Sequence, residues 1–274
     1  MASYGIIFDL DGTLADTMDD LKTAMNATLT KLGYETRTKF ELVKFLNNGS
    51  REFVRRSLPT AVQTEDFIIE SALEIYGQEY GKCFCDKTRA YPGIYEVVQL
   101  LKKEKFKLGV LSNKPDRFVK TIILKLFGHN TFDFVMGQSD LPCKPDPASA
   151  NYVAKALGVK PSRCIFVGDS DVDIKTAINA EMRSIGVSWG YRSKELLIDT
   201  GANYIAESAG DILEHALECV RIIKLEKKLN KERKNQPEPI MTDADEAKEA
   251  TGSTMVINIV TEEEIKLSKQ KKKK

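Results

Sequence analysis

Two carboxylates stand one residue apart near the start of the chain, in the segment "FDLDGTLADT" at residues 8–17. They are Asp9 and Asp11, and they follow a short apolar run, Tyr4–Phe8, that predicts a buried strand. Residues two apart in an extended chain share a face, so the two side chains are expected to point to the same side. Like charges held close together favour different protonation states, which suits a pair in which one carboxylate attacks and the other carries a proton.

Three more polar segments occur where a predicted strand gives way to a helix. They are Ser112-Asn113-Lys114 after "LGVL", Lys144-Pro145 after "SDLPC", and "GDSDVD" (168–173) after "CIFV". In an open parallel sheet the carboxyl edge of the strands is where ligands bind. The four segments are therefore expected to meet at one edge.

The side chains in these segments form a chemical set. Asp9, Asp11 and Asp169 are hard oxygen donors of the kind that suits Mg²⁺. Ser112 offers a hydroxyl and Lys144 a positive charge, and backbone amides at helix starts can cradle a dianion. Carboxylates, a metal, a lysine and a hydroxyl indicate phosphoryl transfer, for which an aspartyl-phosphate intermediate is one known route.

The elements that must position this set alternate between strand and helix. The predicted strands are Tyr4–Phe8, Lys107–Leu111, Phe134–Met136, Cys164–Val167 and Arg183–Val187. The predicted helices are Ile94–Lys103, Asp116–Phe127, Pro147–Leu157, Asp171–Ala180 and a final one from Ala209 to about Lys234. This alternation predicts an α/β fold with a doubly wound, Rossmann-like parallel sheet.

Two stretches depart from that rhythm. Residues 16–88 show helical spacing and no convincing strand, which predicts an inserted helical cap between the core segments 1–15 and 89–234. Residues 235–274 are polar and charged, and a disordered tail is expected there. Within the tail, Met255–Val260 is weighed as an added edge strand, and Lys271–Lys274 is interpreted as a solvated end.

Bulk composition narrows the class of protein. The chain has 274 residues, 42% of them hydrophobic and 30% charged, and a net charge of only +1, which argues against a general nucleic-acid binder. The five cysteines are irregularly spaced, which predicts reduced thiols. We expect no transmembrane segment, no secretory leader and a cytoplasmic location. The oligomeric state stays open.

The four segments, in this order, resemble the motifs of the haloacid dehalogenase-like (HAD) phosphatases with a C1-type cap. The resemblance covers about residues 4–220 and is greatest to the phosphoglycolate phosphatases, through "YPGI" (91–94), "LSNKPDRFV" (111–119), "KPDP" (144–147), "GVSWGYRS" (186–193) and the cap stretch "NNGSREFVRRSL" (47–58). One departure is Glu181, where the family commonly has glycine. This departure puts the local turn geometry in doubt but not the catalytic set.

The resemblance implies roles for the carboxylates. Asp9 would attack phosphorus and become the aspartyl-phosphate, while Asp11 would protonate the leaving alcohol and then deprotonate the attacking water. Mg²⁺ would be held by Asp9, the carbonyl group of Asp11 and Asp169, with Asp173 ordering the metal's surroundings. Asp171 is interpreted only as a first-turn residue of its helix.

The resemblance also implies a phosphate site and a small phosphorylated metabolite as the substrate. Ser112, the Asn113 amide and Lys144 would bind the phosphoryl oxygens. The candidates for contact with the leaving group are the cap residues Asn48, Ser50, Arg51 and Arg55. The arginines of this stretch could equally form a solvated helix face.

Several alternatives remain open on sequence grounds. The Asp-Gly pair could be a simple turn, and Lys144 an ordinary surface lysine. The substrate could be pyrophosphate, a nucleoside monophosphate or a sugar phosphate, the last also as the substrate of a mutase. A binding or regulatory protein on the same fold is the rival from another class, and the intact catalytic set argues against it.

Overall fold

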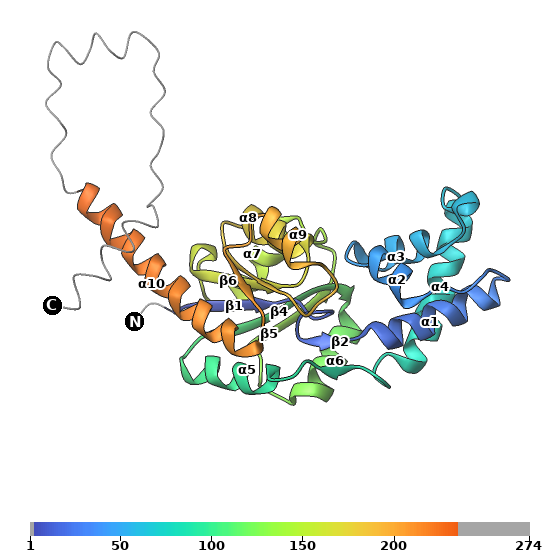
Figure 1. Cartoon of the computed structure of the whole chain (residues 1–274), viewed down its shortest axis with the longest axis horizontal. Helices are drawn as coiled ribbons and strands as arrows, with labels where there is room; N and C mark the ends of the chain where they lie inside the picture. Colours follow the sequence, from blue (N-terminus) through green and yellow to red (C-terminus); the bar gives the residue numbers. More distant parts are fainter. Residues whose placement is uncertain (1–2, 235–274) are drawn as a thin grey trace, which may run out of the picture. The chain divides into compact units, whose positions relative to one another are not determined.

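A six-stranded sheet forms the centre of the fold (Figure 1), and the computed structural model describes residues 3–234 of the chain. In spatial order the strands are β5 (Phe134–Gln138), β4 (Lys107–Pro115), β1 (Gly5–Phe8), β6 (Cys164–Gly168), β7 (Arg183–Val187) and β8 (Tyr204–Ala206). All five neighbouring pairs are parallel. The chain runs outward from β1 through β4 to β5 and then crosses to β6 on the other side of β1. The strand order therefore reverses next to β1, which is the place where such sheets bind ligands.

The central strand is apolar throughout because both of its faces are covered. Ile6 and Phe8 belong to the hydrophobic core on one face, and Ile7 belongs to the core on the other. All three side chains are fully buried. This two-sided burial explains why the strand reads as a continuous apolar run rather than an alternating one.

Helices cover both faces of the sheet. One layer consists of α5 (Ile94–Lys103), α6 (Asp116–Phe127) and the first part of α10 (Ala209–Lys234). The other consists of α7 (Pro147–Ala156), α8 (Asp171–Asn179) and α9 (Lys194–Asp199), with a short 3₁₀ turn η2 (Pro161–Arg163) before β6. Their amphipathic patterns match the burial, so the predicted α/β sheet fold is confirmed.

Between β1 and β4 the chain makes a separate group of helices. A two-stranded antiparallel ribbon, β2 (Ala15–Asp16) with β3 (Arg89–Ala90), marks the exit and the return. The helices between them are α1 (Met18–Lys31), α2 (Lys39–Phe45), α3 (Gly49–Ser57) and α4 (Asp66–Cys83), with the turn η1 (Thr60–Val62). They share a hydrophobic cluster of their own, to which the core contributes Phe118 of α6. This group, residues 18–83, is referred to below as the helical segment.

Asp20 ties the exit of the chain to its return. Its buried carboxylate accepts hydrogen bonds from the Lys87 amide (3.0 and 3.1 Å), the Thr88 amide (2.8 Å) and the Thr88 hydroxyl (2.7 Å). These charge-assisted bonds join the first turn of α1 to the linker that leads back to the sheet. The two connections of the helical segment are thereby held side by side.

The strands and helices that the sequence predicted are present with bounds shifted by a few residues. β8 and the short ribbon were not predicted, since three-residue and two-residue strands carry too little periodicity to be recognised. Glu181 adopts a left-handed φ of 55°, the conformation that favours glycine, so the departure noted in the sequence is a real local cost. The predicted tail at 235–274, including Met255–Val260 and Lys271–Lys274, lies outside the described residues.

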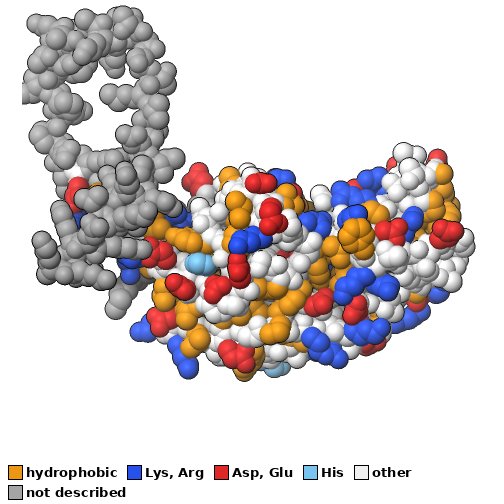
Figure 2. All heavy atoms as spheres, in the orientation of Figure 1, with side chains coloured by type: hydrophobic (Ala, Val, Ile, Leu, Met, Phe, Trp, Pro, Cys, Tyr) orange, Lys and Arg blue, Asp and Glu red, His pale blue; other side chains and the backbone are white. Residues whose placement is uncertain are grey.

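Charged side chains of both signs are interspersed over the face shown in Figure 2. Lys and Arg side chains lie among Asp and Glu side chains there, in keeping with the net charge of +1. None of the helices within residues 3–234 is long and apolar enough to cross a membrane.

Candidate active site

The candidate site is built at the carboxyl ends of β1, β4 and β6. Phe8 pairs with Val110 of β4 on one side and with Val167 of β6 on the other, so Asp9 lies between the ends of both neighbours. Its amide donates to the Val167 carbonyl group at 2.9 Å, which fixes the backbone at this point. The strand itself ends at Phe8, so Asp9 and Asp11 follow β1 rather than lie within it.

This corrects the expectation that a shared strand face aligns the two carboxylates. After Asp9 the chain turns tightly, and the Leu10 carbonyl group accepts hydrogen bonds from the Leu14 and Ala15 amides. Gly12 has a φ of 94° in this turn, and a Cβ there would lie 2.3 Å from Oδ2 of Asp169. The turn nevertheless leaves Asp9 and Asp11 lining the same cavity.

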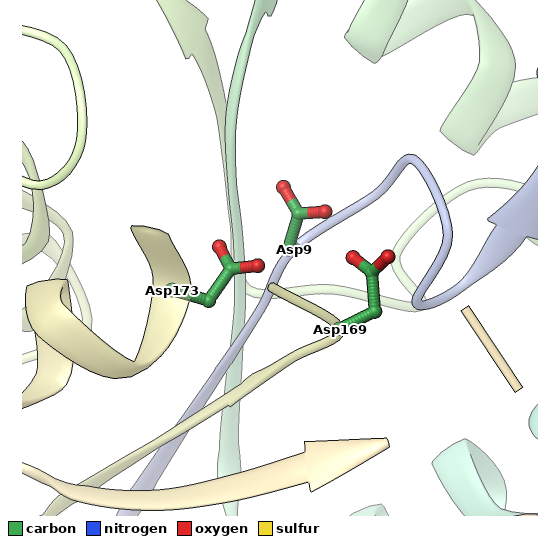
Figure 3. Close-up of side chains that lie close together, drawn as sticks. All are labelled: Asp9, Asp169 and Asp173. Atoms are coloured by element: carbon green, nitrogen blue, oxygen red, sulfur yellow. The ribbon is translucent and has the colours of Figure 1, made fainter. Parts of the chain in front are cut away.

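Three buried carboxylates converge at this edge (Figure 3). Oxygen atoms of Asp9, Asp169 and Asp173 lie within 4.8 Å of one another. Asp9 follows β1, Asp169 follows β6, and Asp173 comes from the first turn of α8. The side chain of Asp11 is not part of this cluster. The sequence assigned Asp173 a supporting role beside the metal, and the structure places its carboxylate in the same cluster as Asp9 and Asp169.

Lys144 is the cation that accompanies these carboxylates. Its Nζ lies 2.6 Å from Oδ1 of Asp9 and 2.6 Å from Oδ1 of Asp173, and only 5% of the residue is exposed. Three carboxylates against one ammonium leave an excess of negative charge in a place with little water. A divalent cation with hard oxygen ligands fits this donor set, and Mg²⁺ is such a cation.

The pKa values of Asp9, Asp169 and Lys144 are shifted because these charged groups are buried close together. Burial raises the pKa of Asp9 well above its usual range, although Lys144 pulls in the other direction. Burial, reinforced by the Asp173 carboxylate, raises the pKa of Asp169 to about 7. Burial alone would lower the pKa of Lys144, but the adjacent Asp173 and Asp9 raise it by more. The cluster is therefore under electrostatic strain that a bound cation would relieve.

Asp169 and Asp173 are each oriented by hydrogen bonds. Oδ2 of Asp169 accepts the Tyr191 amide proton at 2.7 Å, and its Oδ1 accepts from the Thr13 hydroxyl at 3.3 Å. Oδ2 of Asp173 accepts from the amide (3.1 Å) and hydroxyl (2.6 Å) of Ser170 in a capping box at the start of α8. The helix cap that stabilises α8 therefore also aims a carboxylate into the site.

Asp11 has separate partners at the cavity. Its Oδ1 accepts from Nζ of Lys114 at 2.8 Å and from the Thr17 hydroxyl at 2.5 Å. Lys114 is buried and lies next to Ser112 and Asn113, yet the sequence pattern assigned it no role. Its position at the end of an apolar strand could have identified Lys114, because a buried lysine without a partner is energetically costly and therefore implies a nearby carboxylate.

The structure brings the phosphate-site candidates Ser112, Asn113 and Lys144 together. Asn113 Oδ1 accepts from the Lys144 amide at 2.9 Å, and Asn113 Nδ2 donates to the Lys144 carbonyl group at 3.0 Å. This reciprocal pair fixes the Lys144 loop to the end of β4. The Ser112 hydroxyl accepts from the Lys114 amide at 3.3 Å. Ser112, Asn113 and Lys144 all line the cavity that contains Asp9.

That cavity, about 330 Å³ in volume, lies between the sheet edge and the helical segment. Of the four cap candidates, Ser50 and Arg51 line it, while Asn48 and Arg55 do not. Arg51 is engaged by Asp66 (2.6 Å) and Glu70 (2.7 Å), and Arg55 by Glu52 (2.6 Å). The cavity is also lined by residues that the sequence did not name as leaving-group contacts: Leu21, Leu46, Asn47, Phe53, Leu73, Tyr76, Tyr80, Arg117 and Phe118.

Comparison with known proteins defines the class. The sequence model of the family "Haloacid dehalogenase-like hydrolase" matches residues 6–187, and the chain belongs to that family. A phosphoglycolate phosphatase of Psychrobacter arcticus is 38% identical over 193 residues, covering 68% of this chain and 84% of the relative. A phosphoglycolate phosphatase of Colwellia psychrerythraea is 30% identical over 213 residues, covering 76% of this chain and 94% of the relative.

A solved structure agrees with the sequence comparisons. The crystal structure of a putative phosphoglycolate phosphatase from Lactobacillus delbrueckii subsp. bulgaricus matches with a TM-score of 0.73 and 31% identity, covering 79% of this chain and 99% of that one. The chain is therefore a phosphatase of the HAD-like hydrolases, and the predicted family and enzyme class are confirmed.

Proposed function

We propose that this phosphatase is a Mg²⁺-dependent phosphate-monoester hydrolase whose substrate is phosphoglycolate. The observation that carries the reaction type is the buried cluster of Asp9, Asp169 and Asp173 beside Lys144, at the edge of a cavity that Asp11 also lines. The names of the relatives support the choice of phosphoglycolate.

Within this proposal Asp9 is the nucleophile. Its carboxylate lies at the centre of the sheet edge, held through its backbone amide, and it faces the cavity. It attacks phosphorus, the bond to the leaving oxygen breaks, and an aspartyl-phosphate forms. Asp11 gives a proton to the leaving alcohol and later takes one from the water that hydrolyses the acyl phosphate.

Ser112, the Asn113 amide and Lys144 bind the phosphoryl oxygens. The Asn113–Lys144 hydrogen bonds hold the lysine where its ammonium can serve both Asp9 and a transferring phosphoryl group. Asp9, the Asp11 carbonyl group and Asp169 would hold Mg²⁺, with Asp173 beside them. When bound, the cation supplies positive charge that offsets the charge of the phosphoryl group and the carboxylates.

Arg117 is our candidate for the substrate's own carboxylate. Four cationic side chains line the cavity, and three have carboxylate partners: Lys114 with Asp11, Lys144 with Asp9 and Asp173, and Arg51 with Asp66 and Glu70. Arg117, at the start of α6, has no carboxylate partner within the described residues. Its side chain is solvent-exposed, and its guanidinium lies over the Phe118 ring, 4.6 Å from the ring centroid. Since no carboxylate of residues 3–234 is bound to it, the guanidinium can pair with an anion in the cavity that it lines.

Residues 16–88 are proposed to act as a cap that closes over the site. The helical segment forms one wall of the cavity through α3 and α4, and its two connections run side by side through Asp20. Closure would exclude water and bring leaving-group contacts to the phosphoryl site.

A phosphate-release panel tests the function. Purified protein is assayed with and without Mg²⁺ on phosphoglycolate, pyrophosphate, a nucleoside monophosphate and a sugar phosphate, and Asp9→Asn, purified in the same way, is assayed beside it. The proposal expects Mg²⁺-dependent release with phosphoglycolate as the best substrate and none from the variant. Equal release by Asp9→Asn would refute the mechanism, and a better substrate in the panel would replace phosphoglycolate.

Arg117→Met tests the carboxylate contact separately. We expect a rise in KM for phosphoglycolate of at least about tenfold, because a charged hydrogen bond is lost. Activity on an ester without a carboxylate should be unchanged. Equal KM values for wild type and variant on phosphoglycolate would remove Arg117 from the site.

A further inference from the structure

The loop after β7, residues 189–192, contacts both the catalytic turn and the helical segment. Trp189 Nε1 donates to the Thr13 carbonyl group at 3.2 Å. The Tyr191 amide donates to Asp169 at 2.7 Å, and the Tyr191 hydroxyl accepts from the Thr17 amide at 3.1 Å. A Cβ on Gly190 would lie 2.2 Å from Cβ of Asp169, so the loop backbone packs directly against that carboxylate's side chain. The loop is thus fixed to the site at several points.

The next residue, Arg192, reaches from this fixed loop to the helical segment. Its guanidinium donates through Nη1 to the Val43 carbonyl group at 2.7 Å and through Nη2 to the Leu46 carbonyl group at 3.2 Å. Helix α2 ends at Phe45, where the last carbonyl groups are not followed by a further helical turn, and that of Val43 accepts a long hydrogen bond from the Leu46 amide at 3.4 Å. A residue about 150 positions away in the sequence therefore caps the C-terminal end of α2, where a positive charge is also favoured by the helix dipole.

The chain that leaves this capped end forms part of the cavity wall. Asn47 and Gly49 have left-handed φ values of 93° and 81°, which turn the chain from α2 into α3. Leu46, Asn47, Gly49 and Ser50 all line the cavity. Residues 46–50 are called the cavity turn below.

The core holds the cavity turn at two points. Asn113 Nδ2 donates to the Asn47 carbonyl group at 3.2 Å, next to the phosphate-site candidates. Arg192 holds its first residue and the helix before it, next to Asp169. The two anchors therefore approach the turn from the β4 end and from the β7 loop.

We propose that Arg192 is a positioning residue for substrate selection, which sets the place of the cavity turn over the phosphoryl site. This inference rests on the proposed function, since the turn is taken to face the leaving group. Arg192 itself touches no reacting atom. Its removal is expected to impair substrates that depend on contacts with the cavity turn and to spare those that do not.

The planar guanidinium is required because it bridges two carbonyl groups at once. Lysine offers one ammonium on a flexible stem and can hold only part of this arrangement. Arg192→Lys should therefore fall between wild type and Arg192→Met.

Arg37→Met is a matched control. Arg37 is also half-buried, and its Nε donates to the Ser57 carbonyl group at 2.9 Å. Unlike the Arg192 contact, this hydrogen bond joins two residues of the helical segment to each other. Removing it costs an arginine–carbonyl hydrogen bond without releasing the helical segment from the core. Thermal unfolding of all the variants shows how much stability each has lost.

The assay compares phosphoglycolate with p-nitrophenyl phosphate. The p-nitrophenolate of the second substrate is a good leaving group, so its departure needs few contacts with the protein. Arg192→Met is expected to lower kcat/KM for phosphoglycolate by about 10- to 100-fold, the effect of a misplacement on the scale of 1 Å. Its kcat/KM for p-nitrophenyl phosphate should change by less than about threefold, and Arg37→Met should not separate the two substrates. Equal losses on both substrates in Arg192→Met, or the same separation in Arg37→Met, would overturn the proposal.

Hydrogen exchange provides a readout that needs no substrate. Amides of residues 43–50 should exchange faster in Arg192→Met than in wild type, and Arg192→Lys should be intermediate. Unchanged exchange in this stretch would overturn the positioning role. If wild type fails to hydrolyse phosphoglycolate while exchange responds as expected, the proposed substrate fails and the positioning of the turn stands.

Discussion

Replacing Asp169 by Asn should stabilise the metal-free protein at neutral and alkaline pH. The side chain is fully buried near Asp9 and Asp173, and in the absence of a cation its charge is repelled by theirs. Asparagine keeps an oxygen that can accept the Tyr191 amide proton and an amide group that can face the Thr13 hydroxyl. The substitution therefore removes the charge with little loss of hydrogen bonding.

The size of the effect follows from the pKa of Asp169. Burial raises this pKa from an ordinary value of 3.8 to about 7 in the folded state. Because the folded pKa is the higher one, the folded state binds more protons, so this group's contribution to stability is present below about pH 4 and is lost as the pH rises to 7. The loss amounts to roughly 4 kcal/mol, which Asn at position 169 avoids. For a chain of this size that corresponds to a rise in Tm of roughly 8–16 °C.

The assay is unfolding of wild type and Asp169→Asn in EDTA at pH 5 and pH 8. The variant should be more stable than wild type by roughly 2 kcal/mol at pH 5 and by roughly 4 kcal/mol at pH 8. Adding Mg²⁺ at pH 8 should then raise the Tm of wild type by more than that of the variant. A variant that is less stable than wild type at pH 8 in EDTA would refute the electrostatic account of the cluster.

Three other substitutions test the architecture around the site. Asp20→Ala should lower the free energy of unfolding, measured by urea titration, by about 3 kcal/mol, because the buried donors of Lys87 and Thr88 lose their acceptor. A loss under about 1 kcal/mol would contradict this expectation. Gly190→Ala should cut kcat/KM for phosphate release by at least about 100-fold, because its Cβ would lie 2.2 Å from Cβ of Asp169; full activity would show that the loop can move aside. Glu181→Gly should raise the free energy of unfolding by up to about 1 kcal/mol, because the residue has a φ of 55°, and a lower stability would mean that its backbone is unstrained.

The sequence predicted most of the sheet and the meeting of its motifs. Buried parallel strands read as apolar runs, and the carboxyl ends of such strands meet at one edge. The order of the motifs along the chain was therefore enough to group Asp9 with Ser112, which lines the same cavity, and with Asp169, which belongs to the same carboxylate cluster. The place of Lys144 in the loop after β5 followed from the same rule. What periodicity could not give was the turn after Phe8, because a strand end is set by backbone hydrogen bonds rather than by the apolar pattern.

The helical segment was predictable as helices but not as a cavity wall. Charge pattern drew attention to Arg51 and Arg55, yet both are engaged by acidic neighbours on the segment itself. The residues that connect the segment to the core, Arg192 and Asn113, act on backbone carbonyl groups, which are the same for every residue type. Such contacts cannot be predicted from the pattern of side chains along the sequence.

The central claim is that Asp9 carries the phosphoryl group during turnover, and trapping that group tests it most directly. Wild-type protein with Mg²⁺ and phosphoglycolate is quenched in mid-turnover and reduced with borohydride, which converts an aspartyl-phosphate into homoserine, and the peptides are then mapped by mass spectrometry. The account predicts homoserine at position 9 in a substrate-dependent amount, and none in Asp9→Asn. Homoserine at another aspartate, or substrate turnover at the wild-type rate in Asp9→Asn, would contradict it.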